Sequence, residues 1–307
     1  MQYVVSRLLH GVVVLFGVSL LVFGLTWLTG DPASVLLPID TPPERAQEFR
    51  RAFGLDQPPP IQYAVFLQRA IRGDFGTSFR HRTPALQLVL ERLPVTLRLM
   101  GAALAFALLV SVPLGLVAAA FHDQLPDFVA RVVALVGQSL AAPWLGVMLI
   151  FLFAVNLRWL PSSGASRPES IVLPAIVAGA YSAAGLTRLL RSSMLEVLAN
   201  DYIRTARAKG LTGRLILWRH ALRNAALPVL AFLGVQFTFM FGNTVIAETI
   251  FAYPGMSRLA VEAIGTRDMP VIQVFVLLAG ALVVVVNLVL DLVFAWVDPR
   301  IRLKRGV

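Results

Sequence analysis

The side chains that could do chemistry in this 307-residue chain are few, and they lack the spacing of a catalytic or metal site. No phosphate-binding loop of the form G-x-x-x-x-G-K-[ST], no H-E-x-x-H motif and no G-x-S-x-G motif occurs. The four histidines, His10, His81, His122 and His220, are far apart, and cysteine is absent. We therefore expect no enzyme activity, no metal and no cofactor in this chain, so that any nucleotide hydrolysis resides in another subunit.

The densest polar cluster is basic. Residues 201–220 read DYIRTARAKGLTGRLILWRH and contain five arginine or lysine side chains. Asp201 is suited to cap a short helix that ends at Lys209, and Gly210 to follow it in a left-handed conformation. The chain is then expected to resume a helix near Arg214.

Small side chains in this basic segment would let the groove of a partner approach the backbone. They are Thr205, Ala206 and Ala208. The alternative is a solvated loop whose positive charge only sets the orientation of the chain in a membrane.

The elements that carry this segment are apolar. The chain is 57% hydrophobic and 14% charged, with a mean hydropathy of +0.75, which predicts an all-α integral membrane protein. Six runs are long enough to cross a bilayer: 9–29, 97–121, 129–155, 171–190, 226–250 and 271–297. The third contains Pro143 and the fourth Pro174, which membrane helices tolerate. The first is longer than a signal-peptide core and lacks a cleavage site, so we expect a retained helix.

The positive charge indicates the orientation. Residues 188–223 contain eight arginine or lysine side chains against two acids, which predicts that they and both termini are cytoplasmic. The net charge of +10 lies between apolar runs, which argues against nucleic-acid binding. We divide the chain into 1–29 (N-terminal segment and first transmembrane helix), 30–96 (extracytoplasmic loop), 97–297 (five-helix transmembrane core with cytoplasmic segment 191–224) and 298–307 (basic cytoplasmic tail).

The loop 30–96 is predicted to contain two short amphipathic helices. One lies in RAQEFRRAFGLDQ and ends at Gly54, and the other lies in PPPIQYAVFLQRAIRGDFG, with proline at its start and glycine at its stop. The outer membrane face or an extracytoplasmic partner would cover their apolar faces.

Polar side chains inside the apolar runs usually face protein or water, because their burial in lipid is costly. The candidates for a translocation path are Gln138, Ser139, Gln236, Asn243 and Thr244. The alternative is hydrogen bonding between helices, which we favour for Asn287 and Asp291. Glu248 lies near the outer end of its run, where it could sit at the membrane interface. The turn at Pro254, Gly255 and Met256 either only reverses the chain or serves as an outer gate or a docking edge.

Several stretches together resemble the permease subunits of ABC-type importers, in the dipeptide, oligopeptide and nickel group. The cytoplasmic motif of such permeases aligns here on RTARAKGL followed by RHALRN, with Gly210 at the glycine position. Arg204 and Thr205 replace the usual glutamate and alanine, and Arg223 stands where the motif has proline. GDPA, FGLDQPPPIQY, RGDFGTSF, RLPVTLRL, ETIFAYPGMSRLAVEAIGTRDMPVIQ and DLVFAWVDPRIR follow the order of the family over nearly the whole length.

The resemblance implies a type I importer permease fold with six transmembrane helices in the bacterial cytoplasmic (inner) membrane. It implies a second homologous permease, two cytoplasmic ATPase subunits that bind ATP and magnesium, and an extracytoplasmic solute-binding protein. The implied ATPase-coupling residues, on a cytoplasmic coupling helix and its flanks, are Tyr202, Arg204, Thr205, Ala206, Arg207, Ala208, Lys209, Gly210 and Leu211.

The substrate implied by the resemblance is a short peptide, with nickel or a metal-chelate complex as the alternative and glutathione-like compounds also within the family's range. A stand-alone secondary transporter is the alternative from another class. Such transporters commonly contain internal repeats, and we find no repeat in this sequence.

Overall fold

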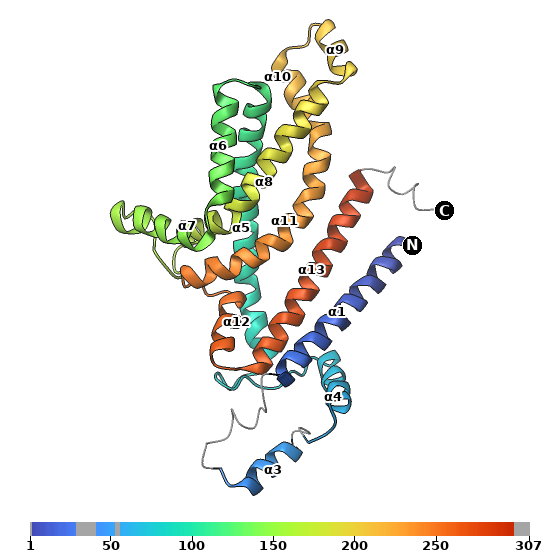
Figure 1. Cartoon of the computed structure of the whole chain (residues 1–307), viewed down its shortest axis with the longest axis vertical. Coiled ribbons are helices and arrows are strands. Elements are labelled where there is room, and N and C mark those ends of the chain that lie inside the picture. Colours follow the sequence, from blue (N-terminus) through green and yellow to red (C-terminus); the bar gives the residue numbers. More distant parts are fainter. Residues whose placement is uncertain (1, 29–40, 53–55, 298–307) are drawn as a thin grey trace. The chain divides into compact units, whose positions relative to one another are not determined.

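The computed structural model describes residues 2–28, 41–52 and 56–297, and these fold into helices joined by short turns (Figure 1). The chain forms two compact units. The first contains the residues up to Pro94 together with Met256–Val293, and the second contains Val95–Gly255. The only pairing of extended residues among those described is a single bridge between Thr77 and Pro84. The predicted all-helical class is therefore confirmed for this part of the chain.

Four helical stretches of the described residues are long and apolar enough to cross a membrane. The stretches are Ala85–Ala120, Pro168–Leu198, Gly213–Ile250 and Met269–Leu290. They contain, in this order, α5 (Ala85–Ala120), α8 (Val172–Leu198), α11 (Leu222–Ile250) and most of α13 (Met269–Val297). They coincide with four of the six predicted spans and begin before each of them, because the helices start outside the apolar core. α1 (Gln2–Leu28) contains a shorter apolar stretch, Leu9–Gly24. The count of six spans stays a prediction.

The third predicted span is not one helix, which corrects the prediction for 129–155. α6 (Leu125–Ser139) and α7 (Ala142–Leu149), which a π-helix extends to Asn156, meet at an angle of 105°. Leu140 and Ala141 have extended backbones, and Pro143 is the second residue of α7. Proline is accepted there because the first N–H groups of a helix need no partner within it, so Pro143 helps to begin a helix.

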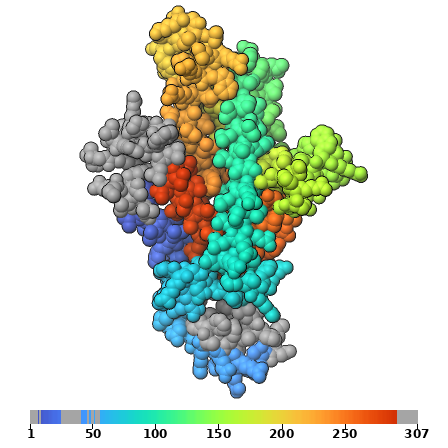
Figure 2. All heavy atoms as spheres, turned by 180° about the vertical axis from the view of Figure 1, so that it is seen from behind, coloured from blue at the N-terminus to red at the C-terminus, as the bar shows by residue number. Residues whose placement is uncertain are grey.

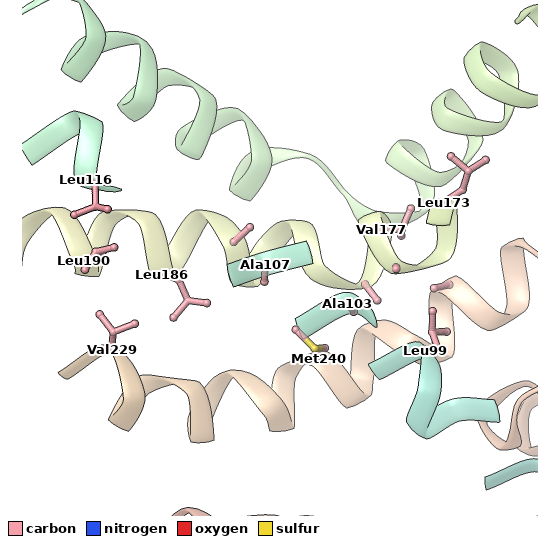
Figure 3. Packing of buried hydrophobic residues seen from close by; sticks show 14 of the residues in the cluster. Leu99, Ala103, Ala107, Leu116, Leu173, Val177, Leu186, Leu190, Val229 and Met240 are labelled. Atoms are coloured by element: carbon pink, nitrogen blue, oxygen red, sulfur yellow. The ribbon is translucent and has the colours of Figure 1, made fainter. Parts of the chain in front are cut away.

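The core of the second unit lies where α8 packs against α5 and α11 (Figure 3). Apolar side chains from all three helices are buried, among them Leu99, Ala103, Leu186, Leu190 and Met240. Gly179 of α8 allows the closest approach, since a Cβ atom there would be 2.5 Å from the carbonyl oxygen of Ala103. α6 covers another side of α8.

In the first unit, α1 and α13 run antiparallel. A Cβ atom on Gly11 would contact Val284, and one on Gly280 would contact Leu15 and Val18. Higher residue numbers in α1 thus lie beside lower residue numbers in α13. Small residues of this kind let membrane helices approach closely.

The second predicted amphipathic helix is α4 (Pro59–Ile71), and one side of it packs on α1 of the same chain. Ile61, Val65 and Ile71 of α4 remain exposed, so its contact with the outer membrane face or a partner stays a prediction. The hydroxyl groups of Ser19 and Tyr63 are 2.8 Å apart, and the ring of Phe23 contacts Tyr63 and Phe66. Proline begins α4 and Gly73, with φ of +76°, follows its end, as predicted.

Two further helices differ from expectation or lie partly outside the described residues. α3 (Pro43–Ala52) matches the first amphipathic helix, but its predicted stop at Gly54 lies outside the described part, as do GDPA and the basic tail. α12 (Met256–Gly265) was not predicted, because the sequence analysis assigned only a turn to its start.

We predict that Gly179→Ala destabilises the protein, because the new methyl group would overlap a backbone oxygen that cannot move away without separating α5 from α8. Overpacking of this kind costs about 1–3 kcal/mol. Gly101→Ala on α5 is the matched control, since nothing lies within 4 Å of a Cβ there and alanine favours the helix. Thermal unfolding of the purified subunit in detergent measures both. Equal melting temperatures for the two variants would contradict the close packing of α5 and α8.

Candidate functional site

The basic segment forms a short helix at one end of the second unit (Figure 2). α9 (Asp201–Ala208) is fixed to the unit by one apolar face, on which Ile203 and Ala206 are buried against Ile216. Leu198 and Leu211 flank this cluster. The helix is therefore attached to the end of α8 and to the beginning of the next helical stretch rather than free in solvent.

The end of α9 has the geometry of a Schellman cap. Gly210 has φ of +79°, its N–H donates to the Arg207 carbonyl at 2.9 Å, and the Leu211 N–H donates to the Ala206 carbonyl at 3.3 Å. Leu211 also packs on the cluster that contains Ala206, and an apolar contact of this kind frequently accompanies a Schellman cap. The predicted left-handed glycine after the short helix is confirmed.

The start of α9 corrects the predicted cap by one residue. Asn200 is the N-cap, with φ of −71° and ψ of 149°, and its side chain makes no capping bond. The Asn200 amide instead donates to the Glu196 carbonyl at 3.2 Å. Asp201 is the first helical residue, where its negative charge suits the N-terminal end of the helix dipole.

The remaining faces of α9 are exposed. The exposed residues are Asp201, Tyr202, Arg204, Thr205, Arg207, Ala208, Lys209 and Gly210. Asp201 and Arg204 form an ion pair at 3.4 Å. Thr205 and Ala208 are thus accessible small residues, as expected, whereas Ala206 points inward and holds the helix in place. The Tyr202 hydroxyl accepts a hydrogen bond of 2.8 Å from Asn224 of α11, which adds a polar link between the two helices.

The chain returns into the unit through α10 (Gly213–Leu215) and a π-helical turn (Ile216–Ala221) that runs directly into α11. The predicted restart near Arg214 is confirmed. Arg214, Arg219 and Arg223 are exposed on this return, so basic side chains outnumber the exposed acids Glu196 and Asp201 at this end of the unit. Such a surface suits an acidic partner.

A buried ion pair, which was not predicted, joins α6 to α8. Asp127 is fully buried, and Arg191 donates to its two oxygens from Nε at 2.6 Å and from Nη2 at 2.7 Å. The Asp123 N–H also donates to Asp127 at 3.1 Å, and Arg131 lies 3.4 Å from it. A bidentate pair of this kind fixes the two helices in one geometry. The only signal in the sequence was an acid four residues before an arginine.

The polar residues predicted for a translocation path lie in different environments. Gln236 is buried and accepts a bond of 2.9 Å from Ser182 of α8, and Thr244 donates to the Phe241 carbonyl of its own helix. These two are satisfied within the bundle.

Other path candidates lie at the break between α6 and α7. Gln138 is half-buried and Ser139 is exposed, one residue before the extended backbone of Leu140. The Ser139 hydroxyl donates to the Leu135 carbonyl at 2.9 Å. Asn243 of α11 is half-buried. Backbone that is not helical at membrane depth is tolerated where it is packed in protein or lines a water-filled space.

Glu248 is packed inside the second unit, and its position at the membrane interface stays a prediction. Its side chain is fully buried and accepts a bond of 2.6 Å from the Thr96 hydroxyl. Gly255 lies against this carboxylate, since a Cβ atom there would be 2.1 Å from it. Pro254 is half-buried, whereas Gly255 and Met256 are buried. A role of this turn in gating or docking stays a prediction.

Two further side chains were considered for bundle packing. Asn287 is exposed, and the side chain of Asp291 lies outside the described residues. In the described part of the chain, no three His, Cys, Asp or Glu residues lie together as a metal site would require.

Comparison with known families gives two matches that together cover most of the chain. Residues 111–303 match the family described as "Binding-protein-dependent transport system inner membrane component". Residues 1–100 match the N-terminal part of the corresponding membrane component.

Known proteins agree with these matches. The glutathione transport system permease protein GsiC of Escherichia coli K12 is 37% identical over 305 residues, which cover 99% of this chain and 100% of that protein, and GsiC of Salmonella typhi has the same identity and coverage. An inward-facing MetNI methionine ABC transporter is similar in fold, with a TM-score of 0.58 and 18% identity over 69% of this chain and 97% of that chain. An amino acid ABC transporter has a TM-score of 0.50 and 17% identity over 70% and 94% of the two chains.

We predict that Asp127→Ala lowers the stability of the subunit, because it leaves the Arg191 guanidinium, only 19% exposed, without its carboxylate. Loss of one partner of a buried pair costs about 3–5 kcal/mol. Asp123→Asn is the matched control, since that side chain is 75% exposed and asparagine tolerates its φ of 59°. Thermal unfolding in detergent compares them. The double variant Asp127→Leu, Arg191→Met should recover part of the loss, and unchanged melting of Asp127→Ala would show that the pair does not hold α6 on α8.

Proposed function

Because the chain belongs to the family of inner membrane components of binding-protein-dependent transport systems, and is the permease subunit of an ABC importer, we propose that it forms the path for short peptides together with a second homologous permease. In this proposal the importer contains two cytoplasmic ATPase subunits and receives substrate from an extracytoplasmic binding protein. The chain crosses the membrane six times, with α6 and α7 as one broken crossing and both termini in the cytoplasm. The positive charge of residues 188–223 supports this orientation.

We propose that α9 is the coupling helix and that it binds in a cleft of one ATPase subunit. The observation that carries this is the combination of an exposed basic face with a rigid attachment. Ile203 and Ala206 are buried, and the cap at Gly210 closes the end of the helix. A rigid helix moves with the ATPase that holds it, so closure of the ATPase pair on ATP would be transmitted to α8 and α11.

We propose that Gln138, Ser139 and Asn243 face the translocation path, because they are not fully buried and two of them flank the broken crossing. Gln236 serves instead to hold α8 and α11 together, since it is buried and hydrogen-bonded to Ser182. Thr244 is buried and bonded within its own helix, so we do not place it on the path. A polar path of this kind suits the backbone of a short peptide, which offers both donors and acceptors.

The proposed substrate class is a short peptide of about the size of glutathione. Its support is the 37% identity, over the full length of both chains, to permeases named for glutathione transport. Nickel or a metal chelate is the other candidate, and a direct comparison of substrates decides between them.

The test is ATP hydrolysis in lipid nanodiscs by this chain co-expressed with the transport genes beside it. With the binding protein present, glutathione or another short peptide is expected to stimulate hydrolysis. Stimulation by a nickel chelate alone would overturn the peptide proposal and leave the importer in place. Failure of any ATPase subunit to co-purify would overturn the coupling role of α9.

We predict that Gly210→Asp abolishes substrate uptake while the protein stays in the membrane. An aspartate at φ of +79° strains the turn after α9 and adds a negative charge beside the basic face. Gly213→Asp is the matched control, because it adds the same charge three residues away at an exposed glycine without positive φ. Uptake of labelled peptide and the amount of subunit in isolated membranes are measured together. Normal uptake by Gly210→Asp would contradict the coupling assignment.

A further inference from the structure

The loop that follows α4 is fixed to the α12–α13 junction by a buried acid. Asp268 is 1% exposed, and the Ser78 hydroxyl donates to its Oδ2 at 2.5 Å. The backbone N–H groups of Phe79 and Arg80 donate to the same carboxylate at 3.1 and 3.3 Å. Three donors from one short loop thus stabilise the carboxylate of Asp268 and hold the loop against it.

The same loop is closed by its own backbone. The Ser78 N–H donates to the Thr83 carbonyl at 2.8 Å, and the Arg82 N–H donates to the Ser78 carbonyl at 2.9 Å. The Ala85 N–H donates to the Gly76 carbonyl at 3.0 Å, and the His81 N–H donates to the Ser78 hydroxyl at 2.9 Å. Residues 78–83 therefore form a rigid turn rather than a flexible linker.

Basic side chains stand on both sides of this anchor. Arg80, His81 and Arg82 are exposed on the turn, and Arg267 is exposed beside Asp268. Arg80 and His81 line a narrow pocket together with Glu262 and other residues of α12 and the α12–α13 junction. The turn therefore lies against α12. We call Arg80, His81, Arg82 and Arg267 the basic cluster.

Two members of the basic cluster occupy backbone positions that favour glycine. Arg82 has φ of 55° and Arg267 has φ of 53°. An arginine in the left-handed region is strained, and a turn alone would be better served by glycine or asparagine. Strained positions of this kind are common at binding sites.

Acidic side chains of α12 and of the loop after α4 already have hydrogen-bond partners. Glu262 accepts from Arg258 at 2.9 Å, and Asp74 accepts from the Gly76 N–H at 3.0 Å. Within the described residues, no carboxylate lies at ion-pair distance from the guanidinium groups of Arg80, Arg82 or Arg267. The cluster therefore presents three arginine charges to an external partner.

We propose that the basic cluster is the docking surface for an acidic edge of the extracytoplasmic binding protein. This rests on the proposed function, including the outward orientation of the loop. Positive charge on that side of a membrane gains nothing from the rule that places arginines in the cytoplasm, so it needs another cause. A turn held by an internal acid and closed by its own backbone suits a protein with a fixed surface, whereas fluid lipid headgroups require no such rigid display.

The test is the rate at which the binding protein, with glutathione present, associates with the complete transporter in nanodiscs. In the triple variant Arg80→Glu, Arg82→Glu, Arg267→Glu we expect association to fall about tenfold or more at low salt. Added salt should slow association with the unmodified transporter and have little effect on the variant. The variant with lysine at all three positions should associate nearly normally.

Arg51→Glu, an exposed arginine on α3, is the control for a change of charge on the same side. Equal rates for the triple glutamate variant and the unmodified transporter overturn the docking surface and leave the importer assignment intact. Loss of binding to phosphatidylglycerol vesicles with unchanged binding-protein association identifies a lipid site and also overturns it. If the unmodified transporter neither binds the binding protein nor hydrolyses ATP in response to it, the proposed function itself fails.

Discussion

The second unit depends on how closely α8 approaches its neighbours. In a bilayer, apolar side chains gain little by packing on one another instead of on lipid, so the helices must be held by shape and by polar contacts. Gly179 supplies the shape, because it leaves the Ala103 carbonyl room to lie against α8. Ser182 with Gln236 and Arg191 with Asp127 supply the polar contacts, to α11 and α6 respectively. All three features are on α8, which makes this helix the common support of the unit.

The same helix carries the proposed contact with the ATPase. Only Ala199 and Asn200 separate α8 from α9, and the cluster of Ile203, Ala206 and Ile216 binds α9 to the return segment. That segment continues into α11 without a linker. A force applied to α9 therefore acts on two helices at once, and the Asp127–Arg191 pair extends it to α6. This short path gives a physical basis for coupling without a long chain of intermediate contacts.

The sequence predicted those features that depend on local pattern. Apolar runs predicted the long helices, and the order of small residues, glycine and basic residues predicted α9 and its cap at Gly210. Features that depend on distant contacts were missed. Nothing near Asp127 indicates that an arginine sixty-four positions later reaches it. The break after Ser139 was missed because proline is accepted inside membrane helices as well as at their starts. α12 was missed because Pro254 and Gly255 before it were assigned only as a turn.

The anchor at Asp268 also has a consequence for how the protein is made. Ser78 and Asp268 are 190 residues apart, and the first unit combines the beginning of the chain with Met256–Val293. A ribosome synthesises the whole of Val95–Gly255 between these two parts. The second unit can therefore assemble while synthesis continues, whereas the turn at Ser78 must wait for its carboxylate. Truncated chains that end before α12 would leave this turn without its anchor.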